Sequence, residues 1–242
     1  MWVVVGASVT ALATGLGALP FAVRREVSPS WLGGANALAA GVMVGASIGL
    51  IGEGLDVGAP GALVGAALGA AFVLLVRWTL PEGDSLRFEG LQADGARTAV
   101  LVMVVMTAHS AAEGIGVGVA YGGGEELGVA TTAAIAVHNI PEGLAIALVL
   151  VPRGISVLHA AGWAIVSSLP QPLLAVPAFL LVDQASALLP VGLGFAAGAM
   201  IWMALRELAP EARRHLPWPR VAALGAVACG AMVLFQIAVL GL

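Results

Sequence analysis

Charged residues are scarce in this sequence. They make up 10% of the 242 residues, none of them is a lysine, and 60% of the residues are hydrophobic, with a mean hydropathy of +1.02. A soluble globular domain carries about 25% charged residues, so this composition excludes that class. Without lysine the chain cannot form the G-x-x-x-x-G-K-[ST] phosphate loop of an ATP-driven pump, and it shows no basic footprint for nucleic acid. The composition is typical of an integral membrane protein.

Cysteine is also nearly absent, since Cys229 is the only one. A single cysteine excludes an intrachain disulfide, and it excludes any metal site built from several thiolates. Because Cys229 lies inside an apolar segment, we expect it to pack as a small apolar side chain.

Apolar segments long enough to cross a membrane fill most of the chain. About 20 residues are needed for a helix to span the bilayer, and we predict eight such helices in a single all-α transmembrane domain over residues 1–242. A short match between residues 39–43 and 196–200 indicates an inverted repeat of the first three and last three helices around the fourth and fifth, a 3+2+3 arrangement. The predicted spans are 1–23, 33–52, 58–79, 98–121, 127–151, 155–182, 186–208 and 219–241.

The arginines are confined to alternate connections between these helices. They follow the first, third, fifth and seventh spans, whereas the opposite connections carry acidic residues. By the positive-inside rule, this pattern predicts a multi-pass protein of the cell membrane with cytoplasmic arginine-bearing loops and both termini outside. The arginines are Arg24, Arg25, Arg77, Arg87, Arg97, Arg153, Arg206, Arg213, Arg214 and Arg220. The acidic residues are Glu53, Asp56, Glu125, Glu126 and Asp183.

Two histidine–glutamate pairs occupy the fourth and fifth predicted helices. His109 precedes Glu113 and His138 precedes Glu142, each by four residues, so both side chains of a pair leave from one helix face. Counted from the intervening turn at 121–127, the histidines lie roughly 17 Å deep, and the glutamates roughly 12 Å and 22 Å. All four side chains can therefore meet near the middle of a hydrocarbon core about 30 Å thick. Carboxylates at that depth are costly unless they are paired or bind a metal, so we predict a metal site.

Polar residues near these pairs each have two interpretations. Ser110 and Asn139 either join the metal ligands or bridge neighbouring helices. Gln171 lies in a polar, proline-rich run, and its amide either faces the same site or satisfies backbone groups freed by the prolines. Glu207 and Glu211 either pair with nearby arginines or form a metal station on the cytoplasmic side.

A proline inside the fifth predicted helix suggests an irregular backbone at mid-depth. Pro141 directly precedes Glu142 and removes a backbone donor, so we expect the helix to be broken there, as in the ligand-binding helices of transporters. The remaining histidines, His159 and His215, are expected to be solvated near the cytoplasmic surface.

The donor set indicates which ions the site can hold. Imidazole and carboxylate suit Zn²⁺, Fe²⁺, Mn²⁺, Co²⁺ and Cd²⁺, whereas the lack of thiolate argues against Cu(I). An intramembrane metal-dependent hydrolase is the enzymatic alternative, and it would need an open coordination position and a separate general base. Two carboxylates neutralise one divalent ion, so we predict a single ion in the site.

At these motifs the sequence resembles the ZIP (Zrt-, Irt-like protein) family of divalent metal transporters, and most closely its bacterial GufA-type branch. The resemblance implies secondary transport of Zn²⁺ or a similar ion into the cytoplasm by alternating access. It further implies no enzymatic activity, no prosthetic group, and a homodimer in the bilayer. The matching segments are the paired His-x-x-x-Glu-Gly motifs, residues 15–21, residues 194–200 and residues 206–211. The ligands implied for the transported ion are His109, Glu113, His138 and Glu142.

The sequence departs from the family pattern at several positions. Members that bind two adjacent ions usually carry Asn at the position of Ser110, Asn or an acid at Asn139, and Glu at Gln171. The carboxylates of a second site are therefore mostly absent. The connection between the third and fourth helices, often rich in histidine in the family, has none here.

Overall fold

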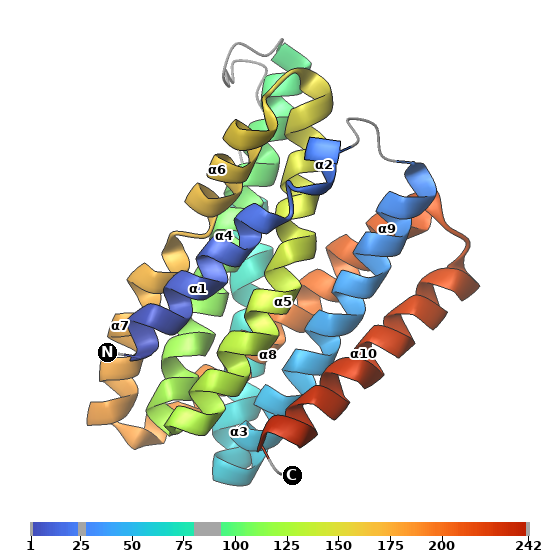
Figure 1. Ribbon diagram of the computed structural model, residues 1–242. Coiled ribbons are helices and arrows are strands. Elements are labelled where there is room, and N and C mark those ends of the chain that lie inside the picture. The colour runs from blue at the N-terminus through green and yellow to red at the C-terminus, as the bar shows by residue number, and fades with distance from the viewer. Residues whose placement is uncertain (1, 24–27, 80–92, 241–242) are drawn as a thin grey trace.

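The chain forms a bundle of long helices in the computed structural model, which describes residues 2–23, 28–79 and 93–240 (Figure 1). Three arginines on which the predicted orientation depends, Arg24, Arg25 and Arg87, lie outside these residues. The elements are α1 (Trp2–Leu16), α2 (Pro20–Val23), α3 (Pro29–Thr79), α4 (Ala93–Gly123), α5 (Glu125–Leu150), η1 (Val151–Arg153), α6 (Val157–Ser167), α7 (Pro170–Gln184), η2 (Ser186–Leu188), α8 (Leu189–Met203), the π-helix η3 (Ala204–Leu208), α9 (Ala209–His215) and α10 (Trp218–Leu240).

Within the described ranges, seven helical stretches are long and apolar enough to cross a membrane. This confirms a multi-pass, all-α membrane protein. The predicted spans 33–52 and 58–79 both fall inside the single element α3. Its apolar stretch runs for 47 residues, more than twice the length needed for one crossing.

α3 folds back on itself near its middle. Gly58 has φ −177° and ψ 89°, which is not a helical conformation. A Cβ atom on Gly54 would lie 3.2 Å from the Cβ of Ala62, whereas residues eight apart in a straight helix are about 12 Å apart along its axis. α3 therefore consists of a first part, residues 29–57, and a second part, residues 59–79, which run in opposite directions (Figure 1).

Two of the apolar stretches are broken just before a proline. α1 ends at Leu16 and α2 starts at Pro20, and α6 ends at Ser167 while α7 starts at Pro170. Proline favours a first helical turn because it has no N–H to leave unsatisfied there. The predicted break at Pro141 is wrong, because α5 runs helically through this residue. Its neighbours in the bundle hold α5 in place, so the lost hydrogen bond does not end the helix.

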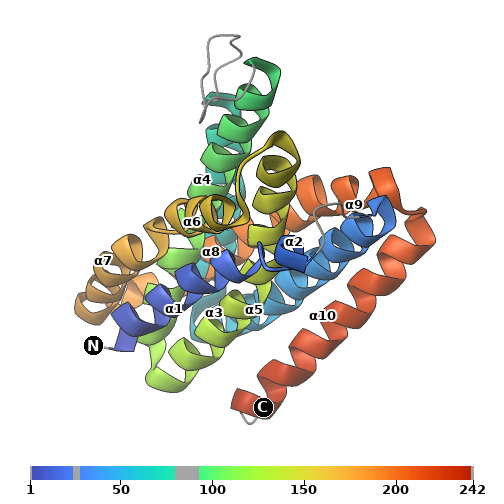
Figure 2. The same cartoon turned by 45° about the horizontal axis from the view of Figure 1, so that its top comes forward.

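The helices pack closely through small residues. α1 lies on α5, and α4 lies on α7; the first part of α3 lies along α10, and the second part lies along α8 (Figures 1 and 2). At these contacts a side chain on Gly143 would overlap the carbonyl oxygen of Thr14, and one on Gly198 would overlap that of Ala66. Such close backbone approach supplies the van der Waals contact that stabilises helix pairs in lipid.

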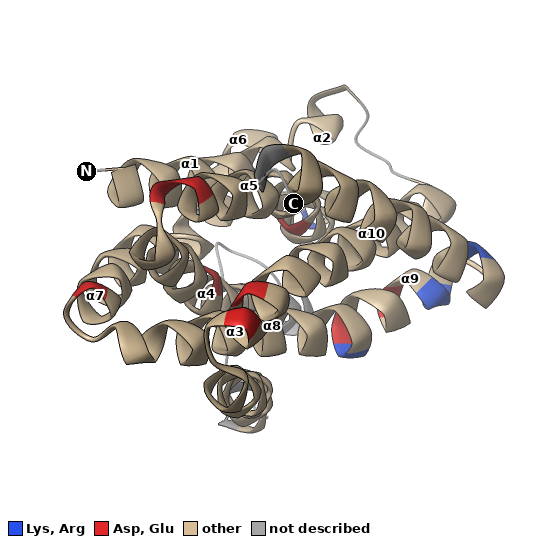
Figure 3. Ribbon diagram, turned by 90° about the horizontal axis from the view of Figure 1, so that it is seen from below, with Lys and Arg blue, Asp and Glu red and all other residues tan. Residues whose placement is uncertain are grey.

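The basic segments lie mainly at one part of the bundle. Seen from below, they gather around η3 and α9, where Glu207 and Glu211 also lie, whereas the charged segments coloured at the start of α5 and on α3 and α7 are acidic (Figure 3). This distribution agrees with the alternation of arginine-bearing and acidic connections along the sequence.

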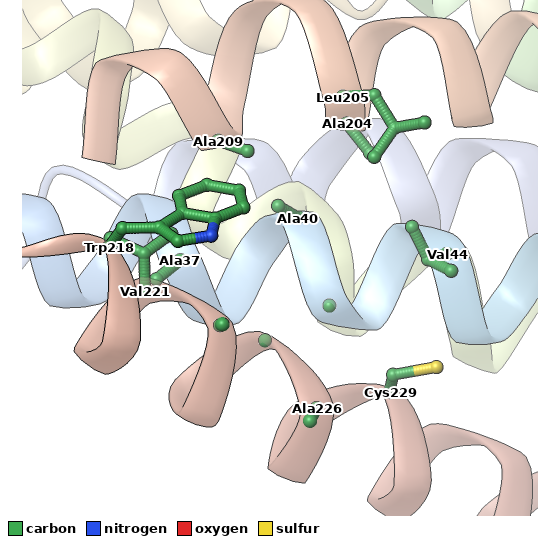
Figure 4. A pocket seen from close by; sticks show the side chains of 13 residues that line it. Ala37, Ala40, Val44, Ala204, Leu205, Ala209, Trp218, Val221, Ala226 and Cys229 are labelled. Carbon is green, nitrogen blue, oxygen red and sulfur yellow. The ribbon is translucent and has the colours of Figure 1, made fainter. Parts of the chain in front are cut away.

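An apolar pocket of about 280 Å³ opens between the first part of α3, the segment η3–α9 and α10 (Figure 4). Val44, Leu205 and Trp218 are among its larger lining side chains, and no charged side chain lines it. Cys229 also lines it as a half-buried free thiol, in agreement with its predicted apolar role. Apart from this single thiol, the pocket lining has no side chain that ligates metal ions, so it is no alternative to the histidines and glutamates of α4 and α5.

Candidate metal centre

The turn between α4 and α5 sets the two histidine–glutamate pairs opposite each other. The helices are joined through Gly124 alone, which has φ 144° and ψ 157°. Backbone with this φ favours glycine, because a Cβ would be strained there. The two long helices therefore run back along each other, and equal distances from the turn correspond to equal depths.

The four predicted ligands form one cluster, which we call the metal quartet: His109 and Glu113 on α4, and His138 and Glu142 on α5. One nitrogen or carboxylate oxygen from each residue lies within 4.8 Å of those of the other three. The four residues are buried, with exposed fractions of 5% or less. No ionisable side chain of this set reaches solvent, so its groups must satisfy one another or a bound ion.

One oxygen of Glu113 faces both imidazoles. Its Oε1 lies 3.1 Å from Nε2 of His109 and 3.2 Å from Nδ1 of His138. The two rings meet edge to face, with centroids 5.4 Å apart, and their Nε2 atoms are 3.4 Å apart. Nε2 of His109, Nδ1 of His138 and Oε1 of Glu113 thus converge on one small volume.

Several atoms of the quartet are buried without a hydrogen-bond partner. These atoms are Oε1 of Glu113, Nδ1 of His109, Nδ1 of His138 and both carboxylate oxygens of Glu142. The short contacts of Glu113 Oε1 bring it close to two nitrogens without the alignment of a hydrogen bond. Buried carboxylate oxygens without a donor are costly, and a divalent cation is the ligand that satisfies several of them together. Two imidazoles and two carboxylates also suit a tetrahedral Zn²⁺ shell, so the residues fit such an ion.

Amide side chains connect the quartet to α7 and α1. Gln171 donates from Nε2 to Oε2 of Glu113 at 2.6 Å, and its own Oε1 accepts from Nδ2 of Asn139 at 3.2 Å. Asn139 also donates to the backbone carbonyl of Thr10 at 2.8 Å. Of the two interpretations of Asn139, helix bridging is therefore seen directly. Ser110 is buried beside the quartet, and its hydroxyl has no hydrogen-bond partner among the described residues.

Residues of α1 near the site were missed by the sequence reasoning. Thr14 on α1 and Ser168, at the break between α6 and α7, have hydroxyl oxygens 2.8 Å apart, and both are fully buried. The signal was available, because Thr10 and Thr14 are polar residues four apart within a span whose other hydroxyl residue is Ser8. Their partners on other helices cannot be read from the sequence.

A cavity continues the ligand-bearing faces of α4 and α5 towards the arginine-bearing end. It measures about 510 Å³. Met106 lies three residues before His109 and Ala145 three residues after Glu142, and both line the cavity. Since residues three apart share a helix face, the quartet lies about one turn beyond the inner wall of the cavity. Further lining residues are Leu32, Asn36, Val102, Leu148, Val149, Glu207, Leu208, Glu211, Arg214 and His215.

Glu207 and Glu211 line this cavity and are not part of the quartet. Glu211 pairs with Arg214 at 2.8 Å and approaches Nε2 of His215 at 3.5 Å. His215 is partly exposed, and it also lines the cavity and faces Glu211. His159 is exposed as predicted.

Comparisons with known proteins agree on one family. A family model described as ZIP zinc transporter matches residues 88–238. Zinc transporter GufA of Myxococcus xanthus is 35% identical over 216 residues, which cover 84% of this chain and 85% of that protein. Zinc transporter ZIPB of Bordetella bronchiseptica is 31% identical over 255 residues, covering 99% of this chain and 82% of that protein. A putative zinc transporter of Arabidopsis thaliana is 45% identical over 225 residues, which cover 92% of this chain and 36% of the plant protein's length.

Proposed function

Because this chain belongs to the ZIP zinc transporter family, we propose that it carries Zn²⁺ or a similar divalent ion across the membrane into the cytoplasm. The observation that carries this proposal is the buried metal quartet with its unpartnered nitrogen and oxygen atoms, held on two membrane-spanning helices. Such groups persist inside a membrane protein where they bind or relay ions.

In this proposal the metal quartet holds the transported ion. Glu113 and Glu142 neutralise its two charges, and His109 and His138 supply the nitrogen ligands that suit borderline divalent metals. Fe²⁺, Mn²⁺, Co²⁺ and Cd²⁺ are compatible with the same donors. Both imidazoles lie against Oε1 of Glu113, an arrangement that lets the three side chains ligate one ion together.

We further infer eight membrane crossings, with α3 crossing twice through its fold at Gly58. We place the protein in the cell membrane. Both termini and the acidic ends then lie outside the cell, and the arginine-bearing ends face the cytoplasm. A membrane-impermeant thiol reagent tests this in a Cys229→Ser background. Cysteine in place of exposed Glu126 should be labelled on intact cells, and cysteine in place of exposed Arg153 only after permeabilisation; the reverse would overturn the orientation.

The packing supports the predicted 3+2+3 inverted repeat. In such a repeat the first, second and third crossings correspond in order to the sixth, seventh and eighth, and α4 corresponds to α5. The packed pair of α1 and α5 then corresponds to the pair of α7 and α4. The packed pair of α10 and the first part of α3 corresponds to the pair of α8 and the second part of α3. Both correspondences lead to helix pairs that are packed together. The first and sixth crossings, which correspond in this repeat, are both broken just before a proline, Pro20 and Pro170.

The ion is released through the cavity at the arginine-bearing end in this scheme. Its wall continues the ligand faces of both helices, and Glu207 and Glu211 supply carboxylates along the way. An ion held by four protein ligands leaves slowly unless the site changes shape, so we infer alternating access in which the ligand-bearing helices move against the rest of the bundle.

A metal-dependent hydrolase is less compatible with this site. Both buried carboxylates point into the cluster with the histidines, which leaves neither as a separate general base. The relatives reported above are described as zinc transporters. We therefore propose no enzymatic activity and no prosthetic group.

Uptake into proteoliposomes tests the proposed function. The purified chain is reconstituted around a Zn²⁺-sensitive fluorophore, and Zn²⁺ is added outside without nucleotide. We expect saturable entry down the metal gradient, absent from protein-free liposomes. Strict dependence on ATP, or ion currents at channel rates, would contradict the proposal. The homodimer implied by the family stays a prediction, to be checked by native mass spectrometry of the same preparation.

A further inference from the structure

We propose that Gln171 is a positioning residue that restrains one oxygen of Glu113 and keeps a second divalent ion out of the site. This inference rests on the proposed metal binding by the quartet. It concerns how many ions the site holds and which oxygen of Glu113 is free to bind.

Hydrogen bonds link Thr10, Asn139, Gln171 and Glu113 in series, and the two terminal acceptors of this series fix the direction of every bond in it. The carbonyl of Thr10 and the carboxylate of Glu113 accept only, so the amide facing each of them must turn its NH₂ group that way. Asn139 therefore points Nδ2 at Thr10 and at Gln171 Oε1, and Gln171 points Nε2 at Glu113. A flipped Gln171 would set its oxygen against the Glu113 carboxylate and its NH₂ against that of Asn139.

The backbone holds Gln171 at this distance from Glu113. Gly114 follows Glu113 directly, and a Cβ atom on Gly114 would lie 2.6 Å from Cα of Gln171. α4 and α7 thus meet backbone to backbone beside the carboxylate. Gln171 is fully buried, so the amide has no solvent to turn towards.

The two oxygens of Glu113 consequently have different roles. Oε2 accepts from Gln171 at 2.6 Å, whereas Oε1 has no hydrogen-bond partner and faces both imidazoles. Glu113 therefore offers one oxygen to the ion in the quartet. A second cation next to Oε2 would meet the positive end of the Gln171 amide instead of a ligand.

Charge balance leads to the same limit. Glu113 and Glu142 are the buried carboxylates of the quartet, and together they match one divalent ion. Two such ions at short distance in a low-dielectric interior repel strongly unless further carboxylates lie between or beside them. Gln171, Asn139 and Ser110 are neutral, so they cannot supply that charge.

The test counts Cd²⁺ ions at the quartet by anomalous diffraction and measures Cd²⁺ affinity by calorimetry on the purified full chain. The wild-type protein should show one ion. Gln171→Glu replaces the donor with a third carboxylate and should admit a second ion about 3.5–4 Å from the first, the spacing of two-metal sites. Gln171→Ala removes the donor but supplies no carboxylate for a second ion, so it should keep one ion with roughly 10–100-fold weaker affinity, as is usual when a group that orients a metal ligand is removed.

Gln236→Ala is the matched control. Gln236 is also a buried glutamine on a membrane helix, and it donates to the backbone carbonyl of Ala46, away from the quartet. Its truncation should leave Cd²⁺ affinity unchanged. If Gln171→Glu does not fold, the Cd²⁺ affinity of Gln171→Ala still tests whether Gln171 positions Glu113 for the ion.

Three outcomes would overturn the inference while leaving the proposed function intact. These are two ions at the quartet in the wild-type protein, wild-type affinity in Gln171→Ala, or a single ion in folded Gln171→Glu. A wild-type protein with no ion at the quartet would instead contradict the proposed function itself.

Discussion

The two halves of this bundle differ in how many buried polar side chains they contain. One half, which we call the site half, consists of α1, α4, α5, α6 and α7; the other, the frame, consists of α3, α8 and α10. Among the described residues, most buried polar side chains belong to the site half. They are Thr10, Thr14, His109, Ser110, Glu113, Thr131, His138, Asn139, Glu142, Ser167, Ser168 and Gln171. The frame contributes Asn36, Ser47 and Gln236.

The frame combines few buried polar groups with close backbone packing, which the site half shares where Gly143 meets Thr14 and Gly118 meets Ala175. Gly65 and Gly69 on α3 lie against the backbone of α8, and Gly194 and Gly198 on α8 lie against the backbone of α3. Contacts of this kind are specific and leave few alternative arrangements. The site half holds hydrogen-bonded and metal-ligating groups and two helix breaks, which are the features that allow local rearrangement. The proposed alternating access would move the site half against the frame, and the following experiments test this proposal in order of expected effect.

The largest difference between the halves should be a difference in Zn²⁺ uptake when a buried polar side chain is replaced. Glu113→Gln or Glu142→Gln removes a charge that the ion requires, so Zn²⁺ uptake into proteoliposomes should fall by at least about 100-fold, more than the usual loss for a group outside the ligand shell. Gln236→Ala in the frame should retain near wild-type uptake. Equal losses in both halves would mean that these side chains matter only for folding.

Cross-linking should distinguish motion between the halves from motion within one. Val119 on α4 and Gly192 on α8 face each other across the halves, with 3.2 Å between the Val119 Cβ and a Cβ placed on Gly192. This is close to disulfide geometry. In a Cys229→Ser background, oxidation of the Val119→Cys, Gly192→Cys protein should reduce uptake by at least about tenfold, and a reductant should restore it.

The matched control for this experiment lies within the frame. Gly54 and Ala62 on α3 have the same Cβ separation of 3.2 Å. Oxidised Gly54→Cys, Ala62→Cys protein should transport normally, with free-thiol labelling used to measure the extent of both cross-links. Normal uptake by a fully cross-linked Val119–Gly192 pair would disprove relative motion at this contact.

Packing in the frame can be tested by adding a single methyl group. Gly198→Ala would bring a Cβ into the carbonyl oxygen of Ala66, so we expect a loss of about 1–3 kcal/mol of stability, as for other overpacked cores. Gly230 on α10 has no atom within 4 Å of its Cβ position, so Gly230→Ala should be neutral or slightly stabilising. Thermal unfolding in detergent would compare them, and an unchanged midpoint for Gly198→Ala would argue against close packing there.

The smallest effect is expected at the cavity. Glu211 is already paired with Arg214 and His215, so it can hold a passing ion only weakly. Glu211→Gln should lower the uptake rate by about two- to fivefold, in line with the energies of partly exposed ion pairs. Asp183→Asn, an exposed acid at the opposite end, is the control, and an equal change in both would remove any specific role for Glu211.

Several features of the fold were predictable because they depend on composition and short-range spacing. Long apolar segments cross membranes because an unpaired backbone group in lipid is costly, and this identified the helices. Other features depend on neighbours. The chain passes through Pro141 without ending α5 because surrounding helices hold it, and the fold of α3 at Gly58 does not interrupt the apolar run that a hydropathy window detects.

The sequence by itself determined the membrane class, the confinement of the arginines to alternate connections, and the pairs His109–Glu113 and His138–Glu142, because a spacing of four on a helix and the cost of buried charge are local properties. Only the tertiary structure decided that the two pairs meet in one cluster, that Gln171 donates to Glu113 while Asn139 bridges to Thr10, and that Glu211 and His215 line one cavity. These are contacts between helices far apart in the chain. Which faces meet depends on how small residues let the backbones approach, and that three-dimensional fit is not written in the spacing of residues along one helix.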